Sequence, residues 1–335
     1  MKKITFALAF IILCTSVLFF GCKKNDKLIR VNEVTHSVFY APLYIAINNG
    51  YFADEGLEIE LTNGGGADQS MTALVSNNAD IGLMGPEATI YVVKNGKQDA
   101  PVVFAQLTKR DGSFLIGRKE EPDFKWENTI GKEIIGGRKG GVPAMTLQYL
   151  LEEIKGLNIG TNSTSVNLNT GVAFNLVASA FEGGQGDYCT MFEPSASEFV
   201  KAGKGHIVAS IGADSGEVPY TAFTATKSYI SKNQDKIEKF IRAVYRGYKY
   251  LMSATSEEVA EVILPSFNGS SKESLVTAIN SYKSIDAWVS SPVMKEEAYN
   301  NLIDIMINAG ELDKKVDFDK VVDCSIAKKV LKEIS

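Results

Sequence analysis

The sequence has little of what metal and redox sites are made from. It holds only two histidines, His36 and His206, and four cysteines, with no CxxC pair among them. No cluster of histidine, cysteine and carboxylate has the spacing of a zinc or iron site, so we expect no metal and no cofactor. Two distant histidines also give little basis for a Ser/His/Asp or Cys/His catalytic arrangement. The composition therefore favours a protein that is not an enzyme.

Blocks of one charge, internal repeats and low-complexity segments are absent as well. The formal net charge is −5. Nucleic-acid binding depends on many contacts between cationic side chains and phosphates, so we expect no nucleic-acid partner. Two cysteines, Cys189 and Cys324, lie far from the amino terminus. A disulfide between them stays open for an exported protein, but each cysteine fits more simply as a small buried apolar residue.

What the sequence does have, at its amino terminus, is the pattern of a secretory signal. Two lysines precede an apolar run from Ile4 to Phe20, and Gly21-Cys22 follows. The run is close to the length of about 20 residues that spans a membrane, so an uncleaved anchor is the alternative. A small residue before cysteine is typical of bacterial lipoprotein signals. We therefore expect residues 1–21 to be a lipoprotein signal peptide, and residues 22–27 to be a tether whose Cys22 carries lipid outside the cell membrane.

Cleavage after residue 21 would leave 314 of the 335 residues and would take the net charge from −5 to −7, because two lysines and no acid are removed. A chain of this length usually forms more than one core, so we expect two lobes. Short apolar strands alternate with helical patterns, which predicts mostly parallel sheets covered by helices. The expected strands are Ile29–Val34, Leu57–Leu61, Ile81–Met84, Val102–Leu107, Phe114–Gly117, Glu133–Ile135, Ser165–Leu168, Asp187–Met191, Ile207–Ser210 and Thr221–Ala225.

Helical patterns fill the gaps and then dominate the last third of the chain. Apolar residues recur at three- and four-residue spacing from Ile237 to Leu251, with Ser231 as a candidate cap. The other expected helices are Leu43–Asn48, Asp68–Ser76, Pro86–Lys94, Pro143–Lys155, Gly171–Phe181, Ser195–Lys201, Glu257–Leu264, Lys272–Ile285, Lys295–Asn308 and Asp319–Ile334.

The most specific pattern lies in residues 36–66. Ala41-Pro-Leu-Tyr-Ile-Ala46, Gly50-Tyr-Phe52 and Glu55-Gly-Leu57 resemble the start of the solute-binding proteins of ATP-driven importers for nitrate, sulfonates, taurine and thiamine precursors. The resemblance implies a type II periplasmic-binding-protein fold, in which two α/β lobes are joined by two crossings and the carboxyl-terminal helices complete the first lobe.

That resemblance implies a discontinuous first lobe. We expect lobe 1 to comprise residues 28–110 and 213–335, and lobe 2 to comprise residues 111–212. The crossings are expected near Lys109–Ser113 and Ile211–Ser215, where glycine or aspartate follows an apolar strand, as a hinge requires.

Three turns in the first part of the chain are candidate parts of a binding site, because ligands of open α/β sheets bind beyond the carboxyl ends of strands. Phe39 and Tyr40 could form an aromatic wall, or could pack their loop onto the core. Gly65 and Gly66 would let the backbone and a helix amino terminus approach a ligand. Gly85 and Glu87 stand at a strand end and in the first helical turn, where a purely structural carboxylate is also favoured.

Two further segments with candidate site residues lie in the expected second lobe. The loop 136–143 is rich in glycine but has neither GxxxxGK[ST] nor GxGxxG spacing. Arg138, Lys139 and Gly140 could hold an anion there, or the charges could be solvated. Asp187 and Glu193 bound a strand ending in Phe192-Glu193-Pro194, which resembles the family's aromatic-Glu-Pro, whose Glu often faces the cleft. The alternative for Glu193 is a cap of the next helix.

These features together predict an extracytoplasmic, monomeric lipoprotein that captures a small organic solute between two lobes for a membrane permease. Carboxylates at strand ends favour a ring bearing amino groups, such as a thiamine-pyrimidine precursor. The alternative is an aliphatic sulfonate, taurine or nitrate, if the carboxylates pair with the loop cations. A thiamine-pyrimidine synthase is disfavoured, because the cysteine-rich motif of those enzymes is absent, and an adhesive lipoprotein would need no glycine-lined cleft.

Overall fold

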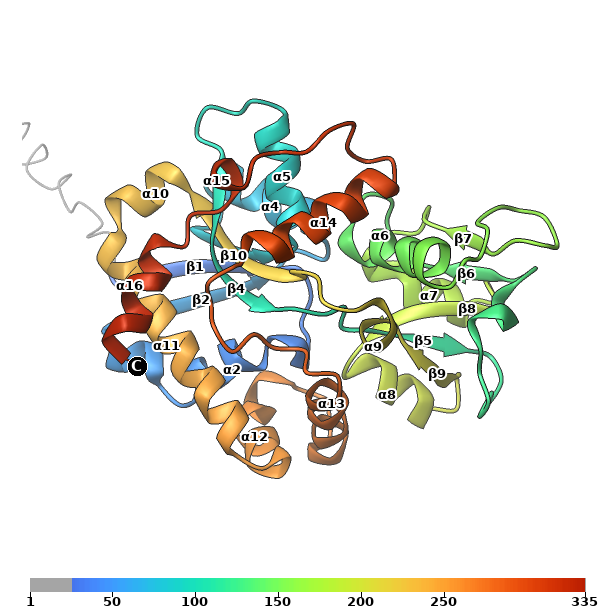
Figure 1. Cartoon of the computed structure of the whole chain (residues 1–335). Coiled ribbons are helices and arrows are strands. Elements are labelled where there is room, and N and C mark those ends of the chain that lie inside the picture. Colours follow the sequence, from blue (N-terminus) through green and yellow to red (C-terminus); the bar gives the residue numbers. More distant parts are fainter. Residues whose placement is uncertain (1–25, 335) are drawn as a thin grey trace, which may run out of the picture.

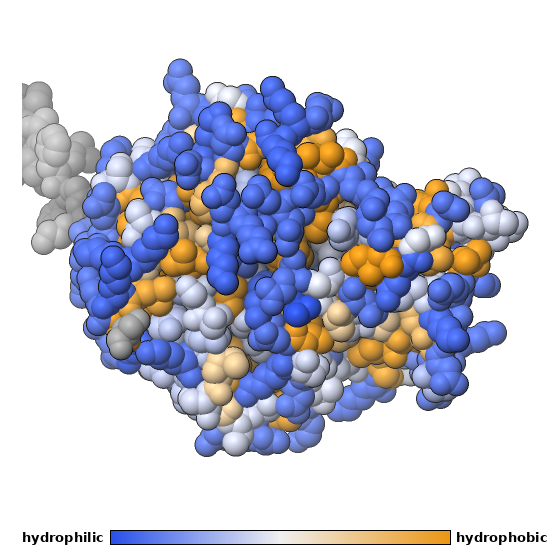
Figure 2. Space-filling view, in the orientation of Figure 1, coloured by the Kyte–Doolittle hydropathy of each residue, from blue (hydrophilic) through white to orange (hydrophobic). Residues whose placement is uncertain are grey.

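The computed structural model describes residues 26–334, and two five-stranded sheets form the centres of two lobes that lie side by side (Figure 1). The expected signal peptide, the lipid site at Cys22 and most of the tether lie outside the described residues. Between residues 26 and 334, no helix combines the length and the apolar character that a membrane crossing needs. The face in Figure 2 is largely hydrophilic, with hydrophobic residues in small separate groups.

Lobe 1 is built on a sheet with the strand order β2-β1-β3-β10-β4. Strand β1 pairs in parallel with β2 and β3, whereas β10 is antiparallel to β3 and β4. The strands are β1 (Leu28–Glu33), β2 (Glu58–Asn63), β3 (Ile81–Met84), β4 (Pro101–Thr108) and β10 (Thr221–Thr226). All eight residues of β4 are buried, although it is an edge strand, because later segments of the chain cover it.

Lobe 2 is built on a sheet with the order β7-β6-β8-β5-β9. Strand β6 is parallel to β7 and β8, and β5 is antiparallel to β8 and β9. The strands are β5 (Ser113–Gly117), β6 (Glu133–Ile135), β7 (Asn167–Asn169), β8 (Tyr188–Phe192) and β9 (His206–Ser210).

Both sheets are therefore mixed, where the sequence suggested mostly parallel pairing. The reason lies in the two places where the chain passes between the sheets, residues 109–112 and 211–220. A strand that enters a lobe from the other lobe starts at the edge where its neighbours end, so β5 and β10 run against them. The second passage begins with the short helix α9 (Ile211–Ser215), at the expected position of the second crossing.

Helices cover both faces of the lobe 1 sheet, with α4 and α5 on one side and α2 and α11 on the other (Figure 1). The close approach of α11 to α2 depends on Gly247, because a Cβ there would lie 2.1 Å from the Pro42 carbonyl oxygen. The helices of this lobe are η1 (Val38–Tyr40), α2 (Ala41–Asn48), α3 (Tyr51–Asp54), α4 (Ala67–Val75), α5 (Pro86–Lys94), α10 (Lys227–Lys232), α11 (Gln234–Ser253), α12 (Ser256–Ile263), η5 (Leu264–Ser266), α13 (Lys272–Ser284), α14 (Glu296–Asn308), α15 (Phe318–Val321) and α16 (Ser325–Ile334).

Two expectations for these helices were wrong. Ser231 does not cap the long helix; it lies inside α10, whose cap is Thr226. The expected helix Asp319–Ile334 is broken between α15 and α16, because Val322 forms a β-bridge with Val103 and the Asp323 amide donates to the Val103 carbonyl. The edge of β4, whose backbone groups no other strand pairs, thus competes with continuation of the helix.

Lobe 2 has fewer helices, and its longest is extended by a π-helical turn. They are η2 (Trp126–Thr129), α6 (Val142–Tyr149), η3 (Leu150–Ile154), η4 (Phe174–Leu176), α7 (Val177–Glu182) and α8 (Ser195–Lys201). Cys189 and Cys324 are both buried and not bonded to each other, which confirms the simpler expectation.

Candidate functional site

A pocket lies between the two lobes, next to the passages that join them. It contains about 490 Å³ of empty space, its mouth included. The β3–α5 turn and the start of α6 contribute to it from opposite sides. Its lining is Val34, Thr35, Tyr40, Ala67, Gly85, Glu87, Arg138, Gly141, Val142, Pro143, Phe174, Phe192, Tyr220 and Thr221.

Glu87 is the most unusual residue of this pocket. It stands in the first turn of α5, directly after Pro86, and its residue exposure is 1 %. Its Oε2 atom is buried and accepts no hydrogen bond from the described part of the chain. Burial raises the pKa of Glu87 to about 7, against the opposing charge of Arg138. A buried acceptor without a donor is costly, so this oxygen is available to a ligand.

Gly85 gives the Glu87 carboxylate its position. A Cβ on Gly85 would lie 1.9 Å from Glu87 Oε2, so the side chain folds back into the space that glycine leaves. The backbone of Gly85 is in the ordinary extended region (φ −65°, ψ 142°). Glycine is therefore needed for space and not for its backbone freedom. The expected site residues Gly85 and Glu87 thus lie together in the pocket.

Arg138 reaches the pocket from the loop of lobe 2, but Asp68 of lobe 1 already faces it. Arg138 Nε lies 3.3 Å from Asp68 Oδ1. Arg138 therefore pairs with the half-exposed carboxylate of Asp68, and its charge also acts on the buried Glu87 carboxyl. Of the other loop candidates, Lys139 is exposed and is not part of the lining. Gly140 contributes its carbonyl oxygen to a contact between the lobes, accepting a 2.9 Å hydrogen bond from the Tyr91 hydroxyl.

The aromatic wall differs from the expected one. Phe39 is fully buried in the core and contacts Phe192, Tyr220 and Tyr282, which is the packing alternative. Tyr40 does line the pocket, together with Phe174, Phe192 and Tyr220. Phe192 stood in the aromatic-Glu-Pro pattern. Phe174 begins η4, within the expected helix Gly171–Phe181 but not among the expected site residues, and Tyr220 precedes β10 in an irregular segment.

The Tyr220 hydroxyl is buried and interacts with the buried carboxyl of Asp111. Burial and this neighbouring carboxyl raise the pKa of Tyr220 well above its usual value. Gly65 and Gly66 stand beside the pocket without lining it. A Cβ on Gly65 would lie 3.6 Å from the side-chain nitrogen of Asn175, so this loop faces lobe 2 across the opening.

Glu193 caps the next helix, which the sequence had left open as the alternative, and Asp187 lies away from the pocket. The Glu193 carboxylate accepts hydrogen bonds from the Ser197 amide (2.9 Å) and hydroxyl (2.7 Å), which is the capping alternative, at α8. Asp187 precedes β8 and accepts from the Glu133 amide. A five-residue strand is about 16 Å long, so Asp187 lies at the far edge of the sheet. Asp187 is therefore not part of the pocket lining.

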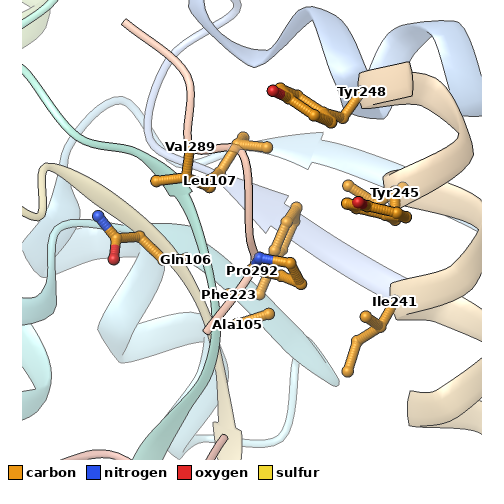
Figure 3. A pocket seen from close by; sticks show the side chains of 10 residues that line it. Ala105, Gln106, Leu107, Phe223, Ile241, Tyr245, Tyr248, Val289 and Pro292 are labelled. Atoms are coloured by element: carbon orange, nitrogen blue, oxygen red, sulfur yellow. The ribbon is translucent and has the colours of Figure 1, made fainter. Parts of the chain in front are cut away.

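A second hollow lies inside lobe 1, between α11 and the sheet (Figure 3). Ile241, Tyr245 and Tyr248 of α11 face Leu107 of β4 and Phe223 of β10 across it. No charged side chain lines this hollow. Across residues 26–334, no group of three or more histidine, cysteine or carboxylate side chains is placed to hold a metal ion.

Comparison with known proteins gives three consistent findings. The profile of the NMT1/THI5-like family matches residues 38–258. YtlA of Bacillus subtilis (strain 168), whose name describes it provisionally as a binding protein, is 40 % identical over 315 residues, 93 % of each chain.

Two solved structures have the same fold. The nitrate-binding protein NrtA of Synechocystis PCC 6803 has a TM-score of 0.75 at 15 % identity, covering 93 % of this chain and 90 % of that one. The ligand-binding component of an ABC-type import system of Staphylococcus aureus has a TM-score of 0.71 at 14 % identity, covering 91 % and 99 %.

Proposed function

The chain belongs to the NMT1/THI5-like family, and we propose that it captures a small ring bearing amino groups, of the thiamine-pyrimidine-precursor class, for an ABC importer. The observation that carries this proposal is the buried Oε2 of Glu87, an acceptor without a donor in an aromatic-lined pocket. An N–H group of a ligand would satisfy it. Leaving such an atom unsatisfied costs about 1–3 kcal/mol, and binding would recover that free energy.

The rings around Glu87 suit the same class of ligand. Tyr40, Phe174, Phe192 and Tyr220 line the pocket from both lobes. Aromatic faces and edges pack well against a flat ring. A simple inorganic anion would use none of this surface.

Charge supports a donor-bearing ligand over an anion. Arg138 is the cation of the lining; it pairs with Asp68, and its charge acts on Glu87. When Glu87 is ionised, the two carboxylates outnumber the one guanidinium. A buried anion would then meet a net negative charge.

The second candidate is an anion such as nitrate or an alkanesulfonate. Arg138 lines the pocket, and the pKa of Glu87 near 7 leaves part of the carboxyl protonated at neutral pH. A protonated Glu87 could donate to an anion oxygen. NrtA, with the same fold, is named as a nitrate-binding protein.

Two variants separate these candidates. Calorimetric titration of 4-amino-2-methylpyrimidine, nitrate and an alkanesulfonate should be compared in wild type, Glu87→Gln and Arg138→Gln. We expect the ring to bind and Glu87→Gln to weaken it about tenfold, the fold-change that corresponds to roughly 1.4 kcal/mol. Tight anion binding that Arg138→Gln removes and Glu87→Gln leaves intact would reject the proposal in favour of the anion. Recovery of unchanged ligand after incubation is the control for catalysis.

Delivery of the ligand to a permease requires that the two lobes close around it and that the protein is anchored to the membrane. Both stay predictions. Residues 28–110 with 213–335 would close on residues 111–212 by bending at the two passages. Small-angle scattering should show a smaller radius of gyration with saturating ligand. Lipid on Cys22 would hold the protein outside the membrane beside its permease, and Cys22→Ser should release the protein or leave its precursor uncleaved.

A further inference from the structure

The sequence contains four pairs in which glycine follows asparagine, and they begin at Asn49, Asn63, Asn95 and Asn268. Asparagine is a chemically labile residue. It loses its side-chain amide most readily before glycine, because glycine has no Cβ to hinder attack by its own backbone nitrogen. The attacking nitrogen must be free to turn towards the asparagine side chain. The hydrogen bonds of the glycine nitrogens therefore decide which pair reacts.

Three of these glycine nitrogens are held by backbone hydrogen bonds. They lie 3.2, 2.8 and 3.0 Å from the carbonyl oxygens to which they donate, in the pairs Gly50–Ile47, Gly64–Glu33 and Gly96–Val93. A nitrogen whose N–H is directed at a carbonyl oxygen can attack the preceding side chain only after that hydrogen bond breaks. The native structure therefore protects the pairs that begin at Asn49, Asn63 and Asn95.

The fourth pair lies in an exposed turn between η5 and α13. The Ser270 amide donates to the Phe267 carbonyl oxygen across this turn (3.1 Å), and Gly269 has a φ of +98°, which is typical of the third residue of a type II turn. The hydrogen bond that closes the turn does not use the Gly269 nitrogen. Neither this nitrogen nor the exposed side chain of Asn268 forms a hydrogen bond to any residue between 26 and 334.

We propose that Asn268 is a site of spontaneous modification, at which the side-chain amide is converted to a carboxylate with water as the co-reactant. The Gly269 nitrogen gives its proton to water or hydroxide and forms a bond to Asn268 Cγ. The bond from Cγ to Nδ2 breaks, and Nδ2 takes up a proton and leaves as ammonia. Water then opens the cyclic imide. Addition at Cγ gives aspartate, and addition at the backbone carbonyl carbon gives isoaspartate, whose main chain runs through Cβ and Cγ.

The turn lies beside a contact between the two lobes. The Ser270 hydroxyl, on lobe 1, donates to Glu198 Oε1 of α8, on lobe 2. A carboxylate at position 268 adds a negative charge close to that of Glu198, and like charges repel. The isoaspartate form also lengthens the main chain next to Ser270. The modification thus changes both charge and backbone at a contact that joins the lobes.

The test is peptide mapping by mass spectrometry after incubation of the purified protein at pH 8, once folded and once unfolded in guanidinium chloride. In the folded protein we expect Asn268 to convert at least tenfold faster than any of the other three asparagines. In the unfolded protein all four should convert at similar rates, because the native hydrogen bonds are gone. Conversion of Asn268 should slow at pH 6, since fewer glycine nitrogens lose their proton.

Two variants provide matched controls. Ion exchange should resolve a more acidic species of the folded wild type as it forms. Asn268→Gln should remove this species, because the longer side chain would have to close a larger ring, which forms more slowly. Asn95→Gln makes the same change in a pair whose glycine nitrogen is hydrogen-bonded, and it should leave the acidic species unchanged.

Similar rates at the four asparagines of the folded protein, or a faster rate at one of the other three, would overturn the inference. Conversion in guanidinium chloride but not at Asn268 of the folded protein would show that the turn protects this pair as well, and would overturn it too. An acidic species that persists in Asn268→Gln would place the modification elsewhere. Circular dichroism before and after incubation establishes that the protein stays folded.

Discussion

The pocket between the lobes and the hollow inside lobe 1 are both lined largely by aromatic and aliphatic side chains, yet they differ in hydrogen-bonding capacity. The interlobe pocket contains the buried Glu87 Oε2, which has no hydrogen-bond donor within residues 26–334, and the Tyr220 hydroxyl, which interacts with the buried carboxyl of Asp111. The hollow in lobe 1 is lined by no charged side chain, and its Gln106 donates to the Thr108 carbonyl oxygen (Figure 3). Apolar space alone is a matter of packing, whereas a buried acceptor without a donor gives a pocket a hydrogen-bonding preference.

The difference follows from where each space is built. The hollow lies between the middle of a helix and the middle of strands, where backbone groups are already paired. The interlobe pocket lies at strand ends, helix starts and the passages between the sheets, where side chains of both lobes project into one space. Four predictions test this contrast.

The largest expected effect is on stability. Burial raises the pKa of Glu87 and that of Asp111, in the first passage, to about 7. Between the unfolded values near 4 and pH 7 the folded state binds more protons, so the free energy of unfolding of the ligand-free protein falls as pH rises through this range. Each group contributes on the order of 3 kcal/mol. Urea denaturation at pH 5 and pH 8 measures the fall, and Glu87→Gln should reduce it. Stability that rises over this range would contradict the account.

The next effect concerns the placement of Glu87. Gly85→Ala should weaken binding of 4-amino-2-methylpyrimidine about tenfold, or roughly 1.4 kcal/mol, because the added Cβ overlaps Glu87 Oε2. In the Glu87→Ala background the same change should cost almost nothing, since the clashing carboxylate is gone. Additive losses in this double-mutant cycle would show that Gly85 acts independently of Glu87.

A smaller effect separates a structural carboxylate from a binding one. Glu193→Ala should lower the free energy of unfolding by about 0.5–2 kcal/mol, the usual loss of a helix cap, because Ser197 loses its acceptor. The affinity for 4-amino-2-methylpyrimidine should stay unchanged. Chemical denaturation measures the free energy of unfolding, and calorimetry measures the affinity for the ring. A loss of ring affinity at unchanged stability would mean that Glu193 binds the ligand and is not structural.

The smallest effect is expected in the hollow of lobe 1. Val244→Ile adds one methyl group to an uncharged space and should change the free energy of unfolding by less than about 1.5 kcal/mol, with no change in ligand affinity. Altered affinity would mean that this hollow takes part in binding, which would contradict the claim that it is only a packing feature.

The sequence predicted the ends of strands well and the direction of individual side chains poorly. Gly85, Glu87 and Tyr40 were expected at the site and line it. The sequence could not show that the side chain of Phe39 points away from the pocket while that of its neighbour Tyr40 points into it. Successive residues of a 3₁₀ turn point about 120° apart, so η1 places Phe39 in the core and Tyr40 at the pocket. Tyr220 was missed because it precedes its strand in an irregular passage.

Asp187 shows a different limit. A short apolar run flanked by two acids gives no indication of which end faces the ligand. That is decided by pairing, because β8 is parallel to β6 and therefore ends at the cleft with Phe192. The mixed sheets have a similar origin, since only the return of the chain from the other lobe sets the direction of β10.

The central claim is that Glu87 makes the pocket a site for a donor-bearing ring. The most direct measurement is the affinity of 4-amino-2-methylpyrimidine relative to nitrate and an alkanesulfonate at pH 8, above the pKa of Glu87 of about 7. The account predicts that the ring binds at least tenfold more tightly than either anion, and that Glu87→Gln narrows the gap. Tighter binding of an anion at pH 8, strengthened further by Glu87→Gln, would contradict it.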